Sequence, residues 1–152
     1  MPSSPNPNLQ NLERVGSLKA EPASKQEIAG FLNGASDYLR DCGQPALSAA
    51  SRFKLAYDAV HALALTALRA NGYRPAQGPG HRRIVFQSLQ HTVSAPASLW
   101  LTLDKYHDKR NASEYAGLIN VSAAEADDIA ALAGELNARV KAWLRSQRPD
   151  LL

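Results

Sequence analysis

The chain has 152 residues and a single cysteine, and its 17 basic and 14 acidic residues give a net charge of +3. A chain of this length can form one domain with an adequate core, and one cysteine excludes an internal disulfide framework. The mild positive charge permits an anionic partner without requiring one. We expect a cytoplasmic protein without a membrane anchor, because no targeting signal is present and the longest apolar run, Ala59–Leu68, is too short to span a bilayer.

The first 23 residues differ in composition from the rest. They are rich in proline and polar residues, and their few apolar residues lack a sustained period. We predict a flexible N-terminal arm over residues 1–23, with a packed patch at Leu12, Val15 and Leu18 at most, and a helical domain over residues 24–152.

Apolar residues recur at helical spacing through the domain, and no segment alternates at the spacing of a strand. Ser24 with Glu27, and Ser122 with Glu125, match the capping box that begins a helix, and Gly72 suits the left-handed residue that follows one. The helices are predicted at residues 24–42, 48–71, 80–91, 95–110 and 122–147. The predicted fold class is all-α, an antiparallel up-and-down bundle of four to five helices, since short links favour antiparallel neighbours.

An up-and-down bundle would bring the end of the second helix, the start of the third and the end of the fourth together. Basic residues would then gather at that end of the molecule, namely Arg69, Arg74, His81, Arg82, Arg83, Lys109 and Arg110. The stretch Gly78–Arg83 adds glycines and exposed amides at a helix start, which attract anions. The candidate phosphate ligands are Arg74, His81, Arg82, Arg83, Lys109, Arg110 and Asn111. The alternative for Gly78–Arg83 is a solvated basic loop.

Other chemistry has little support in the sequence. The histidines, at positions 61, 81, 91 and 107, show no ligand spacing with carboxylates, so we predict neither a metal nor another cofactor. His61 falls on the apolar helix and is expected to be a hydrogen-bonded core residue. Cys42 has no neighbouring histidine and is not expected to act as a nucleophile.

The stretch Lys109–Tyr115, "KRNASEY", stands just before the last helix. A helical bundle with Arg-Asn followed by Tyr at this place resembles the HEPN superfamily, whose small bacterial members often read "RN-x-x-x-Y" here. In this chain the matching residues are Arg110, Asn111 and Tyr115. The helix that ends in Gly72–Tyr73 resembles the second HEPN helix, and the resemblance covers about residues 24–147.

The resemblance implies a HEPN-like homodimer with two copies of the motif across one cleft. In HEPN ribonucleases the arginine stabilises the phosphorane and a histidine after it transfers a proton at the ribose 2′-hydroxyl, without a metal. Arg110 matches the arginine, but no histidine follows it in this chain. The resemblance therefore implies a module that binds RNA or a nucleotide phosphate and has a degenerate nuclease site. It also implies a toxin–antitoxin or defence-type system with a nucleotidyltransferase-type protein partner.

Two alternatives stay open. The first is an active metal-independent endoribonuclease in which Arg110 acts with His107, three residues before it, or with an activated Tyr115 as the proton-transfer group. The second is a structural or protein-interaction bundle, in which Arg110 and Asn111 only end a helix and attach the loop to the core.

Overall fold

The computed structural model describes residues 6–78, 80–116 and 120–152, and the side chains of residues 113–116 lie outside the description. The chain is mostly helical, as predicted. Its elements are α1 (Pro7–Arg14), β1 (Leu18–Ala20), α2 (Lys25–Cys42), α3 (Ala49–Ala70), β2 (Tyr73–Pro75), α4 (His81–Gln87), α5 (Leu89–Thr92), α6 (Ala97–Ala116), α7 (Ala123–Gln147) and a final 3-10 turn (Pro149–Leu151). Within the described residues, none of the helices has the length and apolar character needed to cross a membrane.

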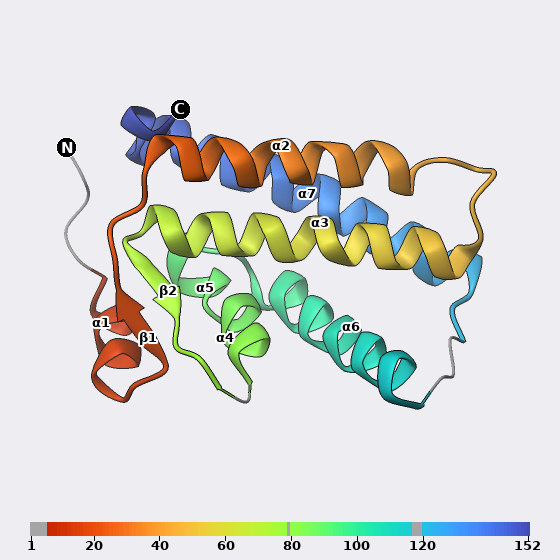
Figure 1. Ribbon diagram of the computed structural model, residues 1–152, viewed down its shortest axis with the longest axis horizontal. Coiled ribbons are helices and arrows are strands. Elements are labelled where there is room, and N and C mark those ends of the chain that lie inside the picture. The colour runs from red at the N-terminus through yellow and green to blue at the C-terminus, as the bar shows by residue number, and fades with distance from the viewer. Residues whose placement is uncertain (1–5, 79, 117–119) are drawn as a thin grey trace.

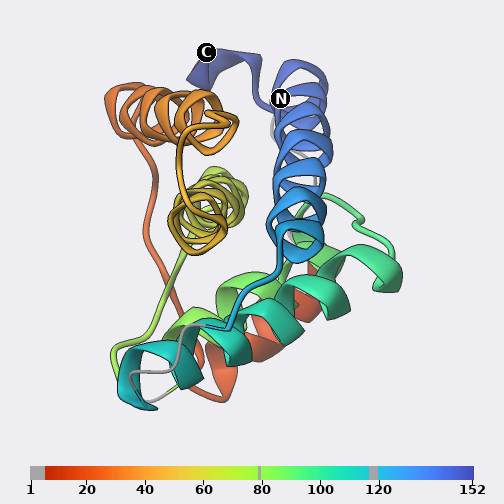
Figure 2. The same cartoon turned by 90° about the vertical axis from the view of Figure 1, so that its right-hand side faces the viewer.

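Three long helices form the main core. α2 and α3 lie side by side and antiparallel, and α7 packs against the other flank of α3 (Figures 1 and 2). Phe53, Leu63 and Leu68 of α3 are almost completely buried, as expected for the helix that is apolar nearly all round. The predicted capping box of Ser122 and Glu125 starts α7. These three helices match their predicted bounds to within one residue at each end.

A second layer made of α4, α5 and α6 covers the lower face of α3 (Figure 2). The predicted single helix over residues 80–91 is instead two consecutive helices, α4 and α5, which meet at Ser88. Ser88 keeps right-handed helical backbone angles, and its buried hydroxyl donates to the Val85 carbonyl. α6 runs on to Ala116 rather than stopping at residue 110. Arg110 and Asn111 therefore lie inside a helix, and the interpretation that they end one is wrong.

The N-terminal segment is structured where the sequence analysis expected an arm. Asn6 caps α1 through its side-chain oxygen, and Leu9 and Leu18 are each only 1% exposed. β1 pairs with β2 in a short antiparallel ladder. The alternation of apolar and polar residues did not predict these strands, because each pairs with a segment more than fifty residues away. The predicted flexible arm is thus wrong for residues 6–20, and Val15, at 70% exposure, is not part of a packed patch.

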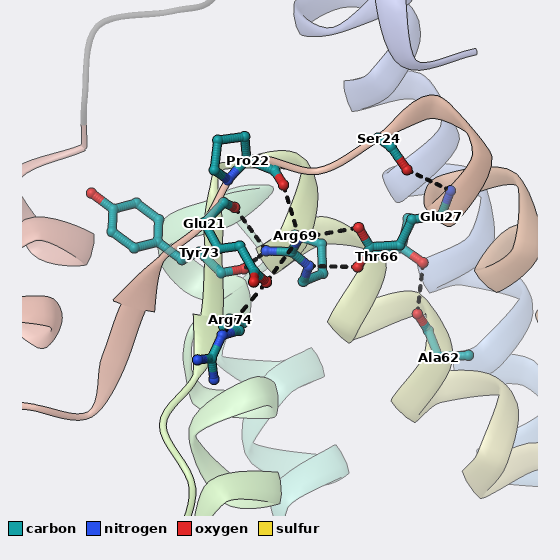
Figure 3. Close-up of polar contacts among 9 residues, drawn as sticks. All are labelled: Glu21, Pro22, Ser24, Glu27, Ala62, Thr66, Arg69, Tyr73 and Arg74. Atoms are coloured by element: carbon teal, nitrogen blue, oxygen red, sulfur yellow. Dashed lines mark hydrogen bonds and ion pairs between the residues drawn. The ribbon is translucent and has the colours of Figure 1, made fainter.

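Arg69 fastens this segment to the main core (Figure 3). Its guanidinium is almost fully buried and donates to the two carboxylate oxygens of Glu27, over 2.7 and 3.1 Å. It also donates to three backbone carbonyls, those of Glu21, Pro22 and Tyr73. Glu27 is used by Arg69, so only the Ser24 half of the first predicted capping box forms. The Arg69 hydrogen bonds lower the pKa of Glu27.

The predicted gathering of all the basic residues at one end is wrong. Arg69 and Arg74 lie where α3 ends and β2 begins, whereas Arg110 lies near the far end of α6, which runs in the opposite sense (Figure 1). Arg110 contacts Tyr57, which is twelve residues, or about 18 Å of helix, before Arg69 on α3. β2 and α4 carry the chain back under the middle of α3, so only the basic residues of α4 approach those of α6.

Candidate functional site

A connected polar cluster lies where α3 and α6 meet. The Tyr57 hydroxyl, buried on α3, is 2.9 Å from Nδ1 of His107 on α6. The Asn111 amide nitrogen is 3.1 Å from Nε2 of the same ring, and Arg110 donates to the Asn111 side-chain oxygen over 3.4 Å. The guanidinium carbon of Arg110 stands 5.3 Å from the centre of the Tyr57 ring, a cation–π arrangement. Spacings of three and four residues place all three α6 side chains on one face.

Both ring nitrogens of His107 face protein groups. With the Asn111 amide in this orientation, Nε2 accepts from Asn111 and the proton of the neutral ring is on Nδ1, which donates to the Tyr57 oxygen. Burial, reinforced by the charge of Arg83, lowers the pKa of His107, while Asp108 and Asp104 act in the opposite direction. The ring is therefore neutral at pH 7 and is held in place by its neighbours. In this arrangement it orients Asn111 and Arg110 more readily than it accepts a proton from a ligand.

A groove of about 450 Å³ opens next to this cluster, between α2 and α3. Asp58 and His61 of α3 and Arg82 of α4 form its polar part. Arg82 also lies beside the Tyr57 hydroxyl, where its charge opposes the effect of burial, which raises the pKa of Tyr57. Arg110 acts on Asp58 and Tyr57 from the α6 side. Tyr57 of the cluster and Asp58 of the groove are consecutive residues of α3, so the groove and the cluster adjoin, although the cluster side chains do not line the groove.

Arg82 differs from the other basic residues predicted here. It is half-buried at the groove, and in the part of the chain that the structure describes it forms no ion pair with a carboxylate. The acidic residue among those that line the groove is Asp58. Burial raises the pKa of its carboxyl group, and Arg110 and Arg82 lower it. Arg82 is therefore able to take an anionic ligand without breaking an existing ion pair.

His61 is uncharged at neutral pH. Burial, with added repulsion from the neighbouring cations, lowers its pKa to about 4. Among the described residues no hydrogen bond reaches its ring, so the expectation of a hydrogen-bonded core histidine is wrong: the ring lines the groove instead. Of the neighbouring cations, Arg82 has the largest effect on this pKa, and Arg110 also contributes. A neutral imidazole offers one donor and one acceptor to whatever occupies the groove.

Several predicted phosphate ligands already have carboxylate partners. Arg83 bridges Asp104, at 2.7 Å, and Asp108, and so joins α4 to α6. Lys109 pairs with Glu125 of α7, and Arg74 pairs with Glu21 at 3.5 Å. His81 is exposed at the start of α4, with Nδ1 3.2 Å from the Gly78 carbonyl oxygen. The structure thus brings together Arg82, Arg110, Asn111 and His107, with His81 at the margin, and separates Arg74 from them.

Three further predictions can be placed. Tyr115 belongs to α6, but its side chain is outside the described residues. Cys42 is buried, and burial raises the pKa of its thiol, which does not favour a nucleophile. Among the residues that the structure describes, no group of three or more His, Cys, Asp or Glu side chains is arranged to hold a metal ion.

Comparison with known proteins found no relative of this chain. No family model matches the chain, and neither the curated proteins nor the solved structures contain a significant match. The resemblance to the HEPN superfamily thus rests on the motif and on the order of the helices.

Sequence reasoning missed the α3 side of the site. Tyr57 and Asp58 fall within the predicted helix over residues 48–71, and their role becomes visible only when α4 and α6 are placed against them. One signal was present: Asp58 and His61 are polar residues three apart within an otherwise apolar stretch. Such a pair on a buried helix must either find partners or border a cavity.

Proposed function

We propose that the chain is a HEPN-like module that binds RNA or a nucleotide through its phosphate, and that its nuclease site is degenerate. The observation that carries the proposal is the position of Arg82 on the groove wall with Asp58, while Arg110, from a different helix, stands over the ring of the neighbouring Tyr57. Arg82 has no ion pair among the described residues, and planar guanidinium groups suit bidentate contact with phosphate oxygens.

The geometry around His107 supports binding over catalysis. A general base needs a nitrogen within hydrogen-bond reach of the ribose hydroxyl, and both nitrogens of His107 are directed at protein groups. A homodimer in a toxin–antitoxin or defence-type system, with a nucleotidyltransferase-type partner, is part of the same proposal by resemblance. Sedimentation at tens of micromolar tests the dimer, which a monomer without affinity for anions would contradict.

The binding test uses a fluorescein-labelled single-stranded RNA and fluorescence anisotropy. We expect affinity to fall as salt is raised, because phosphate contacts release counterions. Arg110→Ala should weaken binding by about tenfold, and Arg110→Lys should lose much of it as well, since an ammonium cannot reproduce the bidentate fork. Arg145→Ala, which removes an exposed arginine of α7, is the matched control and should bind as the wild type does. Equal losses in Arg110→Ala and Arg145→Ala would contradict a specific site.

A second candidate, a metal-independent endoribonuclease, is favoured by one observation: His107, Asn111 and Arg110 are linked in a single hydrogen-bonded chain. We expect the RNA to stay intact after incubation with the wild-type protein in EDTA. Cleavage that persists in EDTA and disappears in Arg110→Ala would instead establish the enzyme. Loss of cleavage in His107→Ala or in Tyr115→Phe would then identify the group that moves the proton.

A further inference from the structure

The groove has a polar end and an apolar end. Two contacts fix the register of the antiparallel helices α2 and α3: the Glu27–Arg69 ion pair near one end and the hydrogen bond from Arg52 to the Cys42 carbonyl near the other. Between them, Tyr38 lies across from Asp58, and Phe31 lies across from Leu65, about 10 Å farther along. The volume of about 450 Å³ is that of an ordinary small-molecule site.

Two glycines of α2 keep the groove open. Gly30 and Gly34 are four residues apart on one face, and a Cβ atom added at either would meet no atom within 4 Å. Glycine lowers the stability of a helix interior, so packing against α3 does not explain either residue. A larger side chain at Gly34 would enter the groove between its two ends.

The polar end can hold a phosphate and a hydroxyl group together. Arg82 lines the groove together with Asp58, and Arg110 adds positive charge from its place over the neighbouring Tyr57 ring. The Asp58 carboxylate forms no ion pair among the described residues. A simple anion would be repelled by Asp58. A ligand that carries hydroxyl donors next to its phosphate would suit both the arginines and Asp58. Acidic residues in other nucleotide sites accept hydrogen bonds from ribose hydroxyls in this way.

The apolar end suits a planar ring. Phe31 and Leu65 are half-buried on its walls, and aromatic side chains stack on nucleobases without regard to sequence. Between the ends stands the neutral His61 ring, which has no hydrogen bond within the described residues and can both donate to and accept from a base edge.

We infer that this groove is a binding site for a single ribonucleotide, with the phosphate at Arg82 and Arg110, the ribose hydroxyls on Asp58 and the base against Phe31. The inference rests on the proposed function, which it narrows from phosphate binding in general to recognition of a ribose. The ligand is either a free ribonucleoside monophosphate or the terminal nucleotide of an RNA, because the groove has room for one unit and not for a strand.

Calorimetric titration with AMP, GMP, CMP and UMP, and with their 2′-deoxy counterparts, tests the inference on the full chain. At least one ribonucleotide should bind, and its deoxy counterpart should bind about tenfold more weakly, because one hydrogen bond to Asp58 is lost. A parallel titration with a six-residue RNA distinguishes the two sources, since a site for RNA ends should prefer the oligonucleotide. Equal affinity for ribo- and deoxyribonucleotides would overturn the inference.

Two variants make the test specific to the groove. Gly34→Leu should lower mononucleotide affinity by at least about tenfold, whereas Gly134→Leu, at an equally open glycine of α7, should leave it unchanged. Both replace a helical glycine by a better helix former, so both should fold. Asp58→Ala provides a second readout, the ratio of the affinity for a ribonucleotide to that for its deoxy counterpart. The substitution should abolish this preference for ribose. Loss of the Asp58 charge near the phosphate would change both affinities equally and leave the ratio unaffected.

The outcomes separate this inference from the proposed function. If Arg110→Ala weakens RNA binding while Gly34→Leu binds mononucleotides as the wild type does, the groove is not the site and the phosphate-binding function stands. If the wild-type protein binds neither RNA nor any mononucleotide, both are wrong.

Discussion

Two arginines, Arg69 at the end of α3 and Arg82 at the start of α4, show how differently this protein uses the same side chain. Arg69 is 4% exposed and is enclosed by the Glu27 carboxylate and three backbone carbonyls (Figure 3). Arg82 is half-buried beside a groove and forms no ion pair within the described residues. The five N–H donors of a guanidinium can all be satisfied by the protein, as happens at Arg69, or be left in part for a ligand.

The difference follows from where each side chain emerges. Arg69 is in the last turn of α3, next to a chain that turns back on itself and presents carbonyl oxygens to it. Arg82 is in the first turn of α4, beside the Tyr57 hydroxyl of the neighbouring helix, and it lines the groove together with Asp58. A buried guanidinium with every partner in place indicates a structural joint, and a partly exposed one without a carboxylate indicates a site.

The largest expected effect is that of Arg69→Ala on stability. The substitution leaves Glu27 without its partner and three carbonyls without donors, and we expect it to lower the free energy of unfolding by about 3 kcal/mol. Glu27 is partly exposed, which keeps the loss near the lower end for a buried pair. Urea denaturation measures it, with the exposed Arg40→Ala as the control. A loss below about 1 kcal/mol would contradict the role of Arg69 as a joint.

Acid should lower the stability contributions of the groove, through His61, and of the Arg69 ion pair, through Glu27, in different pH ranges. His61 has a pKa of about 4 in the folded protein and about 6.5 when unfolded, so the unfolded state binds more protons between these values. The His61 contribution is complete above pH 6.5 and is lost as the pH falls towards 4. The pKa of Glu27 is lowered from 4.5, so its contribution is lost only below that value. Urea midpoints should fall less between pH 6.5 and 4 in His61→Phe than in the wild type, and less below pH 4.5 in Glu27→Gln.

The smallest expected effect on stability is that of Arg82→Ala. Because no ion pair of the described residues is broken, the free energy of unfolding should stay within about 0.5 kcal/mol of the wild type. RNA affinity should nonetheless fall, and the slope of log affinity against log salt should decrease by about one unit. A variant that loses stability as Arg69→Ala does would show that Arg82 is a second structural joint.

The sequence predicted those parts of the fold that depend on local signals. Caps at Ser24, Ser48 and Ser122 and a regular apolar spacing define α2, α3 and α7. α1 and the β1–β2 ladder were missed because they depend on the burial of Leu9 and Leu18 by distant residues. No local pattern contains that information.

The site was predicted only on its α4 and α6 sides. The sequence shows that Arg82, Arg83, Lys109 and Arg110 are basic, but not which of them has a carboxylate partner across the fold. Arg83 and Lys109 have such partners, on α6 and α7. The composition does not show which basic residues have a carboxylate partner, because an ion pair between distant segments depends on the path of the chain through β2 and past Ser88.

The most direct test of the central claim is a crystal structure of the protein with the mononucleotide that binds most tightly in the titrations. The account predicts the phosphate within hydrogen-bond distance of the Arg82 and Arg110 guanidinium groups, and Arg69 with unchanged partners. A phosphate bound elsewhere, for example at Arg74 or Lys109, or no bound nucleotide at saturating concentration, would contradict it.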